Sequence, residues 1–175
     1  MGTRNITIVK VGGKTKVAQY GQWDGYPTGQ GQTIADFLKK VDLEKFKAQV
    51  KKLGVYSSAD LAKAWKDAGA NPKDEWVSSD ISDKKNKAHP ELCRDHGAGI
   101  LQLIYDGVVA KVDLFSGYDT KTGGLVGDSW IEYWYEIDLD KEIIKMNNNK
   151  TFTFKEWTKK DKMKALEKVE EKENE

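Results

Sequence analysis

The chain is organised around one stretch, QYGQWDGYPTGQGQ, which spans residues 19–32. It contains three aromatic rings, four glutamines, four glycines, one proline and one carboxylate. This mixture packs badly in an ordinary strand or helix, because glycine and proline disrupt both. It favours a shaped loop that presents polar groups beside rings, and loops of this kind often carry function. We expect the rest of the chain to be the scaffold of this loop.

Upstream of the loop, two extended runs flank a pair of glycines. Residues 5–11 form a short β-branched run, Gly12-Gly13 follows, and residues 14–23 lead into the loop. Both glycines tolerate positive φ, which the tight turn of a β-hairpin requires. The sequence therefore predicts a hairpin whose second strand ends at the loop.

Downstream, three helices are predicted from capping residues and apolar spacing. A glycine follows the second and the third, where a helix commonly ends. The capping signals are Thr33-x-x-Asp36, Asp42 and Ser57-x-x-Asp60.

Residues 70–88 lack a periodic apolar pattern and contain loop chemistry, including Pro72 and the charged run 83–87. A loop of this length inside a domain is uncommon and is often functional or mobile. We expect Trp76 and Val77 to hold its middle against the core.

The segment after this loop has two interpretations. His89-Pro90-Glu91 can start a helix, but Gly97 and Gly99 weaken its middle. A short helix followed by a buried strand fits equally well. Residues 108–115 predict a strand, and residues 116–128 a glycine-rich loop.

The clearest strand of the chain covers residues 130–139, where apolar and polar residues alternate. Residues 142–146 complete a second hairpin, residues 147–149 form a turn, and residues 151–154 are a last short strand. Residues 158–175 favour a charged helix. The predicted fold is α+β: an antiparallel sheet, made of the N-terminal hairpin and a C-terminal meander, with three to four helices packed on it. We expect one domain over residues 1–157 and a charged helical tail over residues 158–175.

Composition narrows the classes of partner. The net charge is +1, and nearly all basic residues are lysines, with Arg4 and Arg94 the only arginines. This balance argues against a nucleic-acid surface. Cys93 is the only cysteine, so no internal disulfide can form, which fits a reducing compartment. No apolar run reaches the ~20 residues that span a bilayer. We expect a cytoplasmic protein without a membrane partner.

The candidate ligand-binding residues lie in the loop and in two flanking segments. Rings and amides together suit a planar polar ligand such as a base. Arg94 could pair with Asp95, and either arginine could orient Asp24. The alternative is that the aromatic residues of the loop simply fill the core. The candidates are Arg4, Gln19, Tyr20, Gln22, Trp23, Asp24, Tyr26, Arg94 and Asp95.

Two other groups could carry chemistry. His89, Cys93 and His96 could bind zinc or supply a nucleophilic thiol, but no second cluster completes a structural metal site. We expect neither a metal nor a cofactor. Four carboxylates lie along and just after residues 130–139, and they could act in acid–base catalysis or bind a hard cation. The solvated face of a half-buried sheet gives the same pattern, and this is the interpretation that we favour. The four residues are Glu132, Glu136, Asp138 and Asp140.

Several blocks resemble a family of small uncharacterised proteins from bacterial and phage genomes. The resemblance covers residues 3 to 140 with gaps, and the run Gly-Gln-Trp-Asp-Gly-Tyr-Pro at residues 21–27 is its most specific part. It implies a phage or bacterial accessory protein that counters or tunes a host defence system. The matching blocks are Thr3-Arg4-Asn5, Val17 to Gly31, Arg94-Asp95-x-Gly97 with Ile100-Leu101, and Tyr135 to Asp140.

Three functional hypotheses follow. The first is a non-catalytic binding protein that holds a small polar, nucleotide-like ligand or a host protein with the loop at residues 19–32. The second is an amide hydrolase of the N-terminal-nucleophile type, in which Thr3 would act after an unusual cleavage. The third is a nucleic-acid-binding accessory protein.

Overall fold

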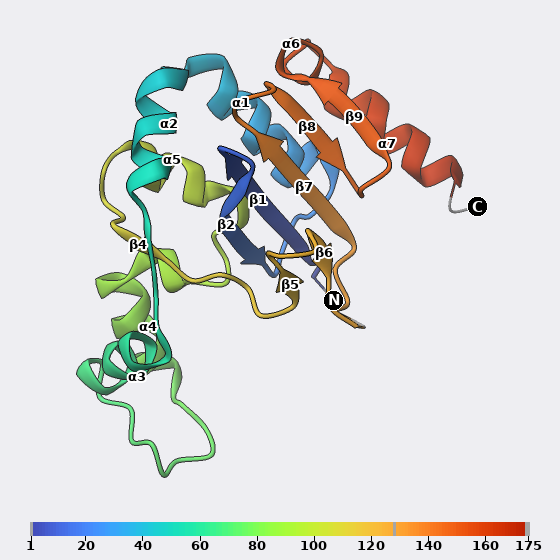
Figure 1. Cartoon of the computed structure of the whole chain (residues 1–175). Helices are drawn as coiled ribbons and strands as arrows, with labels where there is room; N and C mark the ends of the chain where they lie inside the picture. Colours follow the sequence, from blue (N-terminus) through green and yellow to red (C-terminus); the bar gives the residue numbers. More distant parts are fainter. Residues whose placement is uncertain (1, 128, 174–175) are drawn as a thin grey trace.

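The computed structural model describes residues 2–127 and 129–173 (Figure 1). The fold is α+β, as the sequence predicts, with a mostly antiparallel central sheet in the order β2-β1-β7-β8-β9. Seven α-helices lie within the described residues, more than the three to four expected. The strands of the sheet are β1 (Asn5–Val11), β2 (Lys14–Gly21), β7 (Tyr133–Asp138), β8 (Ile143–Met146) and β9 (Lys150–Thr153).

The sheet joins the two predicted strand units through a parallel pair. The β1–β2 hairpin is confirmed, and its turn places Gly12 at φ 60° and Gly13 at φ 71°. The antiparallel meander of β7, β8 and β9 is also confirmed. β1 and β7 run parallel, with Ile6 opposite Trp134. The long connection through the helices makes this possible, because parallel neighbours need a crossover.

One face of the sheet carries the main core. It is covered by α1 (Gln32–Lys40), α2 (Leu43–Lys52) and α5 (Ile100–Tyr105), which Figure 1 shows gathered on one side of the sheet. Trp157 of α6 (Phe154–Trp157) is fully buried in this core. Met163 and Leu166 of α7 (Lys162–Glu173) are also buried there.

The opposite face is covered as well, so the prediction that its carboxylates face solvent is wrong for Glu136. That residue is 5% exposed and forms an ion pair with Lys10, with Nζ and Oε1 3.0 Å apart. A second apolar cluster that includes Ile6, Ile8 and Trp134 lies here. Side chains of residues 114–125, together with Ile131, pack on this cluster, and the segment includes the short hairpin of β5 (Tyr118–Asp119) and β6 (Gly124–Leu125).

Two of the three predicted caps are confirmed. Asp42 accepts a hydrogen bond from the backbone N–H of Lys45, and Ser57 and Asp60 form a capping box at α3 (Ser58–Asp67). The cap predicted at Thr33 is wrong, because a π-helical turn over Pro27–Gly31 runs directly into α1. The Thr33 hydroxyl therefore lies inside the helix and donates to the carbonyl of Gly29, 3.2 Å away.

A lobe made of α3 and α4 (Ser79–Ala88) extends from the sheet, joined by the parallel pair β3 (Gly54–Val55) and β4 (Lys111–Val112) (Figure 1). The loop predicted over residues 70–88 is therefore wrong from residue 79 onward. Because α4 consists almost entirely of polar residues, its sequence lacks the periodic apolar pattern from which a helix is predicted. Trp76 is 87% exposed and Val77 is 44% exposed, so neither holds the segment against the core.

Residues 89–105 contain no continuous helix. Two 3₁₀ turns, Pro90–Leu92 and Gly97–Gly99, precede α5, and the predicted strand over residues 108–115 is reduced to β4. Gly97 has φ 47°, which interrupts a regular helix at that point. Among the described residues, no helix is both long enough and apolar enough to cross a bilayer.

Candidate functional site

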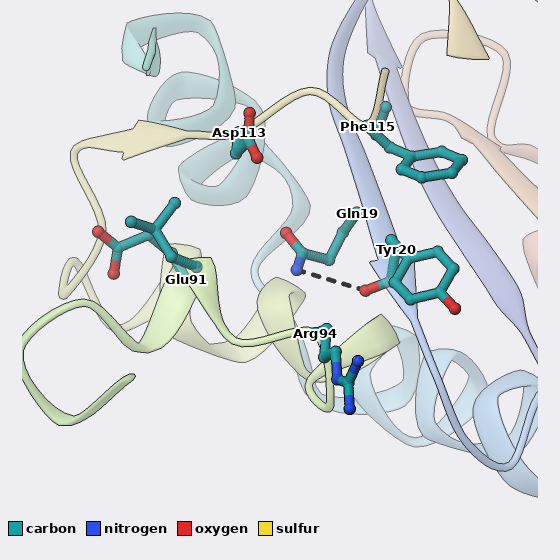
Figure 2. Close-up of a pocket in the computed structure, with 8 residues that line it drawn as sticks. Gln19, Tyr20, Glu91, Arg94, Asp113 and Phe115 are labelled. Carbon is teal, nitrogen blue, oxygen red and sulfur yellow. Dashed lines mark hydrogen bonds between the residues drawn. The ribbon is translucent and has the colours of Figure 1, made fainter. Parts of the chain in front are cut away.

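A crevice of about 180 Å³ opens at the edge of β2 (Figure 2). Three segments that are distant in sequence meet there: the end of β2, the turn after α4, and the strand-like segment after β4. Its walls combine carboxylates, an arginine, an amide and two aromatic rings. The lining residues are Ala18, Gln19, Tyr20, Glu91, Leu92, Arg94, Asp113 and Phe115.

Backbone hydrogen bonds attach these segments to the free edge of β2 and to the residue that follows the strand. The N–H of Gln22 donates to the carbonyl of Arg94 at 2.9 Å. The N–H of Phe115 donates to the carbonyl of Ala18, also at 2.9 Å. Because β2 is an edge strand, its free backbone groups are available for these contacts. The crevice is the space left between the two attached segments.

Tyr20 forms one wall of the crevice. Its ring stacks on Phe115 with a centroid separation of 5.1 Å, and its hydroxyl donates to Oε1 of Gln22 at 2.7 Å. Burial raises the pKa of Tyr20, while the nearby charges of Arg4 and Arg94 lower it by less. The hydroxyl is therefore protonated at neutral pH and remains a hydrogen-bond donor.

Glu91 stands on the opposite side of the crevice, and is 6% exposed. The Tyr56 hydroxyl donates to Oε1 of Glu91, and Nδ1 of His89 lies 3.5 Å from the same oxygen. Burial and the bond to Glu91 raise the pKa of Tyr56, so Tyr56 stays a donor. The carboxylate is held in place by groups that lie outside the crevice.

Asp113 and Lys85 complete the polar environment. Burial raises the pKa of the Asp113 carboxyl, and the charge of Lys85 partly offsets this. Lys85 is 6% exposed, and its Nζ donates to the carbonyl of Leu92 at 2.9 Å. Burial lowers the pKa of Lys85, with opposing effects from Cys93, Asp113 and Glu91. A buried ammonium and two carboxyl groups with restricted hydration thus lie behind the crevice, an arrangement typical of binding and catalytic sites.

The predicted site residues divide into separate groups. Gln19, Tyr20 and Arg94 line the crevice, and Gln22 contacts Tyr20. Trp23 donates from its indole Nε1 to Oδ1 of Asp95 at 3.0 Å. Within residues 2–127 and 129–173, neither arginine guanidinium lies within 4.0 Å of a carboxylate oxygen, so the expected Arg94–Asp95 ion pair is not formed there.

Asp24 and Tyr26 face a different hollow, of about 500 Å³, on the other side of the loop tip. Asp24 is exposed and has φ 54°, a conformation that aspartate tolerates in a turn. Tyr26 contacts the ring of Tyr133 edge-on, with centroids 6.0 Å apart. The structure therefore does not join these two residues to Gln19, Tyr20 and Arg94.

Several polar groups of residues 25–31 are bonded to the core, although the side chains of Tyr26 and Thr28 are exposed. The Tyr135 hydroxyl donates to the carbonyl of Gly25 at 2.7 Å, and Nε1 of Trp157 donates to that of Gly31 at 3.2 Å. Oε1 of Gln30 accepts from the N–H of Ala98 at 2.7 Å. The carbonyl groups of Gly25 and Gly31 and the amide oxygen of Gln30 thus already have hydrogen-bond partners within the protein.

Three polar or aromatic residues of the crevice were not predicted from the sequence: Glu91, Asp113 and Phe115. Asp113 carried a usable signal, because it is the one carboxylate in the apolar run of residues 108–115. Glu91 follows Pro90 as in an ordinary helix start, so nothing in the sequence distinguishes it. No three His, Cys, Asp or Glu side chains are grouped as a metal ion would require in the described parts of the chain, His89, Cys93 and His96 included.

The crevice brings three predicted residues together with newly found ones around one opening. Its donors, acceptors and aromatic faces can hold a small polar molecule, and they provide the basis for inferring what the protein does. Comparisons with protein-family models, with curated proteins and with solved structures find no match to this chain.

Proposed function

We propose that the protein binds a small polar, nucleotide-like ligand in the crevice beside β2, without chemically changing it. The observation that carries this proposal is the convergence of Gln19, Tyr20 and Arg94 with Asp113 and Phe115 on one opening. The first three are among the residues that the sequence indicates, and the other two add an acceptor and an aromatic face.

The chemistry of the walls favours a planar heterocycle. The Gln19 amide offers both a donor and acceptors, and the carboxyl group of Asp113 accepts from a ring N–H or an amino group. The ring of Phe115 supplies an apolar contact. A volume of about 180 Å³ is below the usual 300–1,000 Å³ of a pocket for a whole drug-sized ligand. The crevice therefore suits one ring system, with the rest of the ligand outside.

The two other hypotheses receive less support. Thr3 is 8% exposed, and its carbonyl accepts from the N–H of Gly25 at 3.0 Å, so this residue lies covered by the loop. A nucleophile in that place has no open approach for a substrate. A net charge of +1 with two arginines argues against nucleic acid as partner. The phage origin and the host-defence role that the resemblance implies stay predictions, as does a host protein as the ligand.

Native mass spectrometry of the protein as purified from cells, beside its denatured mass, tests the proposal. We expect a non-covalent adduct of nucleobase, nucleoside or nucleotide size. Asp113→Asn should remove the adduct, because it replaces one oxygen of a half-buried carboxyl group with an NH2 donor and nearly keeps the shape of the side chain. Asp24→Asn is the matched control, since Asp24 lies outside the crevice and asparagine tolerates positive φ.

The reverse pattern, loss in Asp24→Asn alone, would move the site to the loop tip. If no adduct is found, calorimetric titration with adenosine, guanosine, cytidine and uridine decides the matter. The absence of binding to all four, together with a clean mass, would contradict the proposal.

A further inference from the structure

A second hollow lies where the lobe of α3 and α4 joins the sheet. Its volume is about 520 Å³, within the range of roughly 300–1,000 Å³ that is usual for ligand pockets. Its walls come from α3, from the turn after α4 and from the residues that lead into β4. Two backbone hydrogen bonds hold these walls together: the N–H of Gly54 donates to the carbonyl of Ala110 at 3.0 Å, and that of Tyr56 donates to Val112 at 2.9 Å. Of the residues that the structure describes, Glu91 alone lines both this hollow and the crevice.

His89 lines this hollow, and two oxygen atoms orient its ring. Nδ1 of His89 lies 3.4 Å from the hydroxyl oxygen of Tyr56 and 3.5 Å from Oε1 of Glu91. Tyr56 has one hydroxyl hydrogen, and it donates this hydrogen to Oε1 of Glu91. The hydrogen between Tyr56 and His89 must therefore come from Nδ1. In the neutral ring this leaves Nε2 without a proton, as a hydrogen-bond acceptor.

The protonated side of this ring is enclosed, and the rest is open. The side chain of Glu91 is 8% exposed, whereas that of His89 is 34% exposed. The rings of Tyr56 and His89 also contact edge-on, with centroids 6.3 Å apart. Because the two ring nitrogens lie on different sides of the imidazole, Nε2 is turned away from Glu91. A carboxylate behind a histidine fixes the ring and strengthens its other nitrogen as an acceptor.

The other walls of the hollow intersperse donors and acceptors. Oδ2 of Asp60 accepts from the backbone N–H of Ser57 at 3.0 Å and lies 3.1 Å from Nζ of Lys111. In the described parts of the chain no donor is bound to Oδ1 of Asp60. Lys87 is exposed and forms no ion pair within residues 2–127 and 129–173. Val108 adds an apolar surface.

We infer that this hollow binds a polyhydroxylated carboxylic acid, such as a sugar acid. Hydroxyl groups both donate and accept, so they match walls on which donors and acceptors are interspersed. Nε2 of His89 and Oδ1 of Asp60 accept from hydroxyl groups of the ligand, and the ammonium of Lys87 pairs with its carboxylate. The ammonium is a point charge, which suits one carboxylate. This site is separate from the crevice, so either proposal can fail while the other stands.

Calorimetric titration with gluconate and with two matched probes tests the site. Hexanoate has the same carbon chain and the carboxylate but no hydroxyl groups, and sorbitol has the hydroxyl groups but no carboxylate. Gluconate should bind at least about 10-fold more tightly than either probe, the difference expected for one charge-assisted hydrogen bond. Equal binding of gluconate and hexanoate, or no binding of gluconate and glucuronate, would overturn the inference.

Two substitutions locate the bound acid. His89→Asn keeps an amide near the position of Nδ1 but has no atom at the position of Nε2, and Lys87→Gln removes the ammonium. Each should weaken gluconate binding about 10-fold. The matched controls are His96→Asn and Lys84→Gln, because neither residue lines the hollow and Lys84 is exposed on the same helix as Lys87. Equal weakening by the controls would contradict the site.

Nuclear magnetic resonance gives a readout that does not depend on any variant folding. His89 and His96 are the only histidines of the chain, so long-range correlation of imidazole protons with ¹⁵N can follow each ring. In the neutral protein His89 should carry its proton on Nδ1, and gluconate should shift its Nε2 resonance while His96 stays unchanged. A proton on Nε2 of His89 would overturn the inference, because that nitrogen could not then accept.

Discussion

Two segments of this protein have similar composition and opposite environments. The loop at residues 22–31 and the arm at residues 70–78 each contain a tryptophan, a proline and several polar residues. The loop is fixed by side chains from the sheet and from α6, and by a backbone N–H of the segment before α5. Within the described residues, hydrogen bonds of the arm at Lys73 and Asp74 are made to Asn71 of the arm itself.

The difference lies in what surrounds each segment. Carbonyl groups of the loop meet buried donors, such as the hydroxyl of Tyr135 and the indole N–H of Trp157, and a buried polar group must find a partner. The arm lies at the far end of the lobe, away from the sheet (Figure 1), and residues 71–78 are all exposed to solvent. Aromatic and proline content therefore does not tell a fixed loop from a projecting one; proximity to core donors does.

The largest effect is expected for Trp157→Ala, which removes one of the side chains that fix the loop at residues 22–31. Trp157 is fully buried in the core and holds the carbonyl of Gly31. Removing a large buried ring should lower the free energy of unfolding by about 3–5 kcal/mol. Urea denaturation followed by circular dichroism measures the change. A loss below about 1 kcal/mol would show that the loop does not depend on this anchor.

Tyr135→Phe is a smaller and more selective change. It deletes only the hydroxyl that bonds to the carbonyl of Gly25, which leaves a buried acceptor without its partner. We expect a loss of about 1–3 kcal/mol in the free energy of unfolding. Hydrogen exchange should accelerate at the amides of Gly25 and Gln30, and remain unchanged at those of Lys73 and Asp74. Equal acceleration in the loop and the arm would mean that the substitution acts on the whole fold.

The junction between lobe and sheet should show a pH effect. Burial raises the pKa of Asp113 in the folded protein, so the native state binds more protons than the unfolded state above the usual pKa of an aspartic acid. Stability should therefore fall as the pH rises through that window. Asp113→Asn cannot ionise and should flatten this decline. The urea midpoint of unfolding should be measured for the wild type and for Asp113→Asn between pH 4 and pH 7. If the two midpoints change with pH in the same way, Asp113 is not the cause of the decline.

The smallest effect is expected for Trp76→Ala, which tests the projecting side of the comparison. The side chain is 87% exposed, so its removal should change the free energy of unfolding by no more than about 0.5 kcal/mol. The same denaturation assay applies, with Trp157→Ala as the contrasting variant. A loss comparable with that of Trp157→Ala would show that the arm is docked in solution.

Local signals account for the parts of the fold that the sequence predicts correctly. The Gly12-Gly13 turn, the caps at Asp42 and Ser57, and the alternation in β7 each depend on residues close together in the chain. Helix α4 escaped prediction, because its polar surface contacts solvent and the lobe rather than the main core. Part of the crevice was not predicted either, because Glu91 lies in an ordinary helix start and Asp113 lies far from the loop in sequence.

The sequence by itself determined the turns, the caps, the hairpin and the meander, because short-range sterics and hydrogen bonding specify them. Tertiary structure alone decided the parallel pairing of β1 with β7 and the burial of Glu136, since both depend on contacts between distant segments. It also decided the crevice: hydrogen bonds from Gln22 and Phe115 bring two distant segments to β2. The sequence could mark polar and aromatic residues, but only packing determines which of them share an opening.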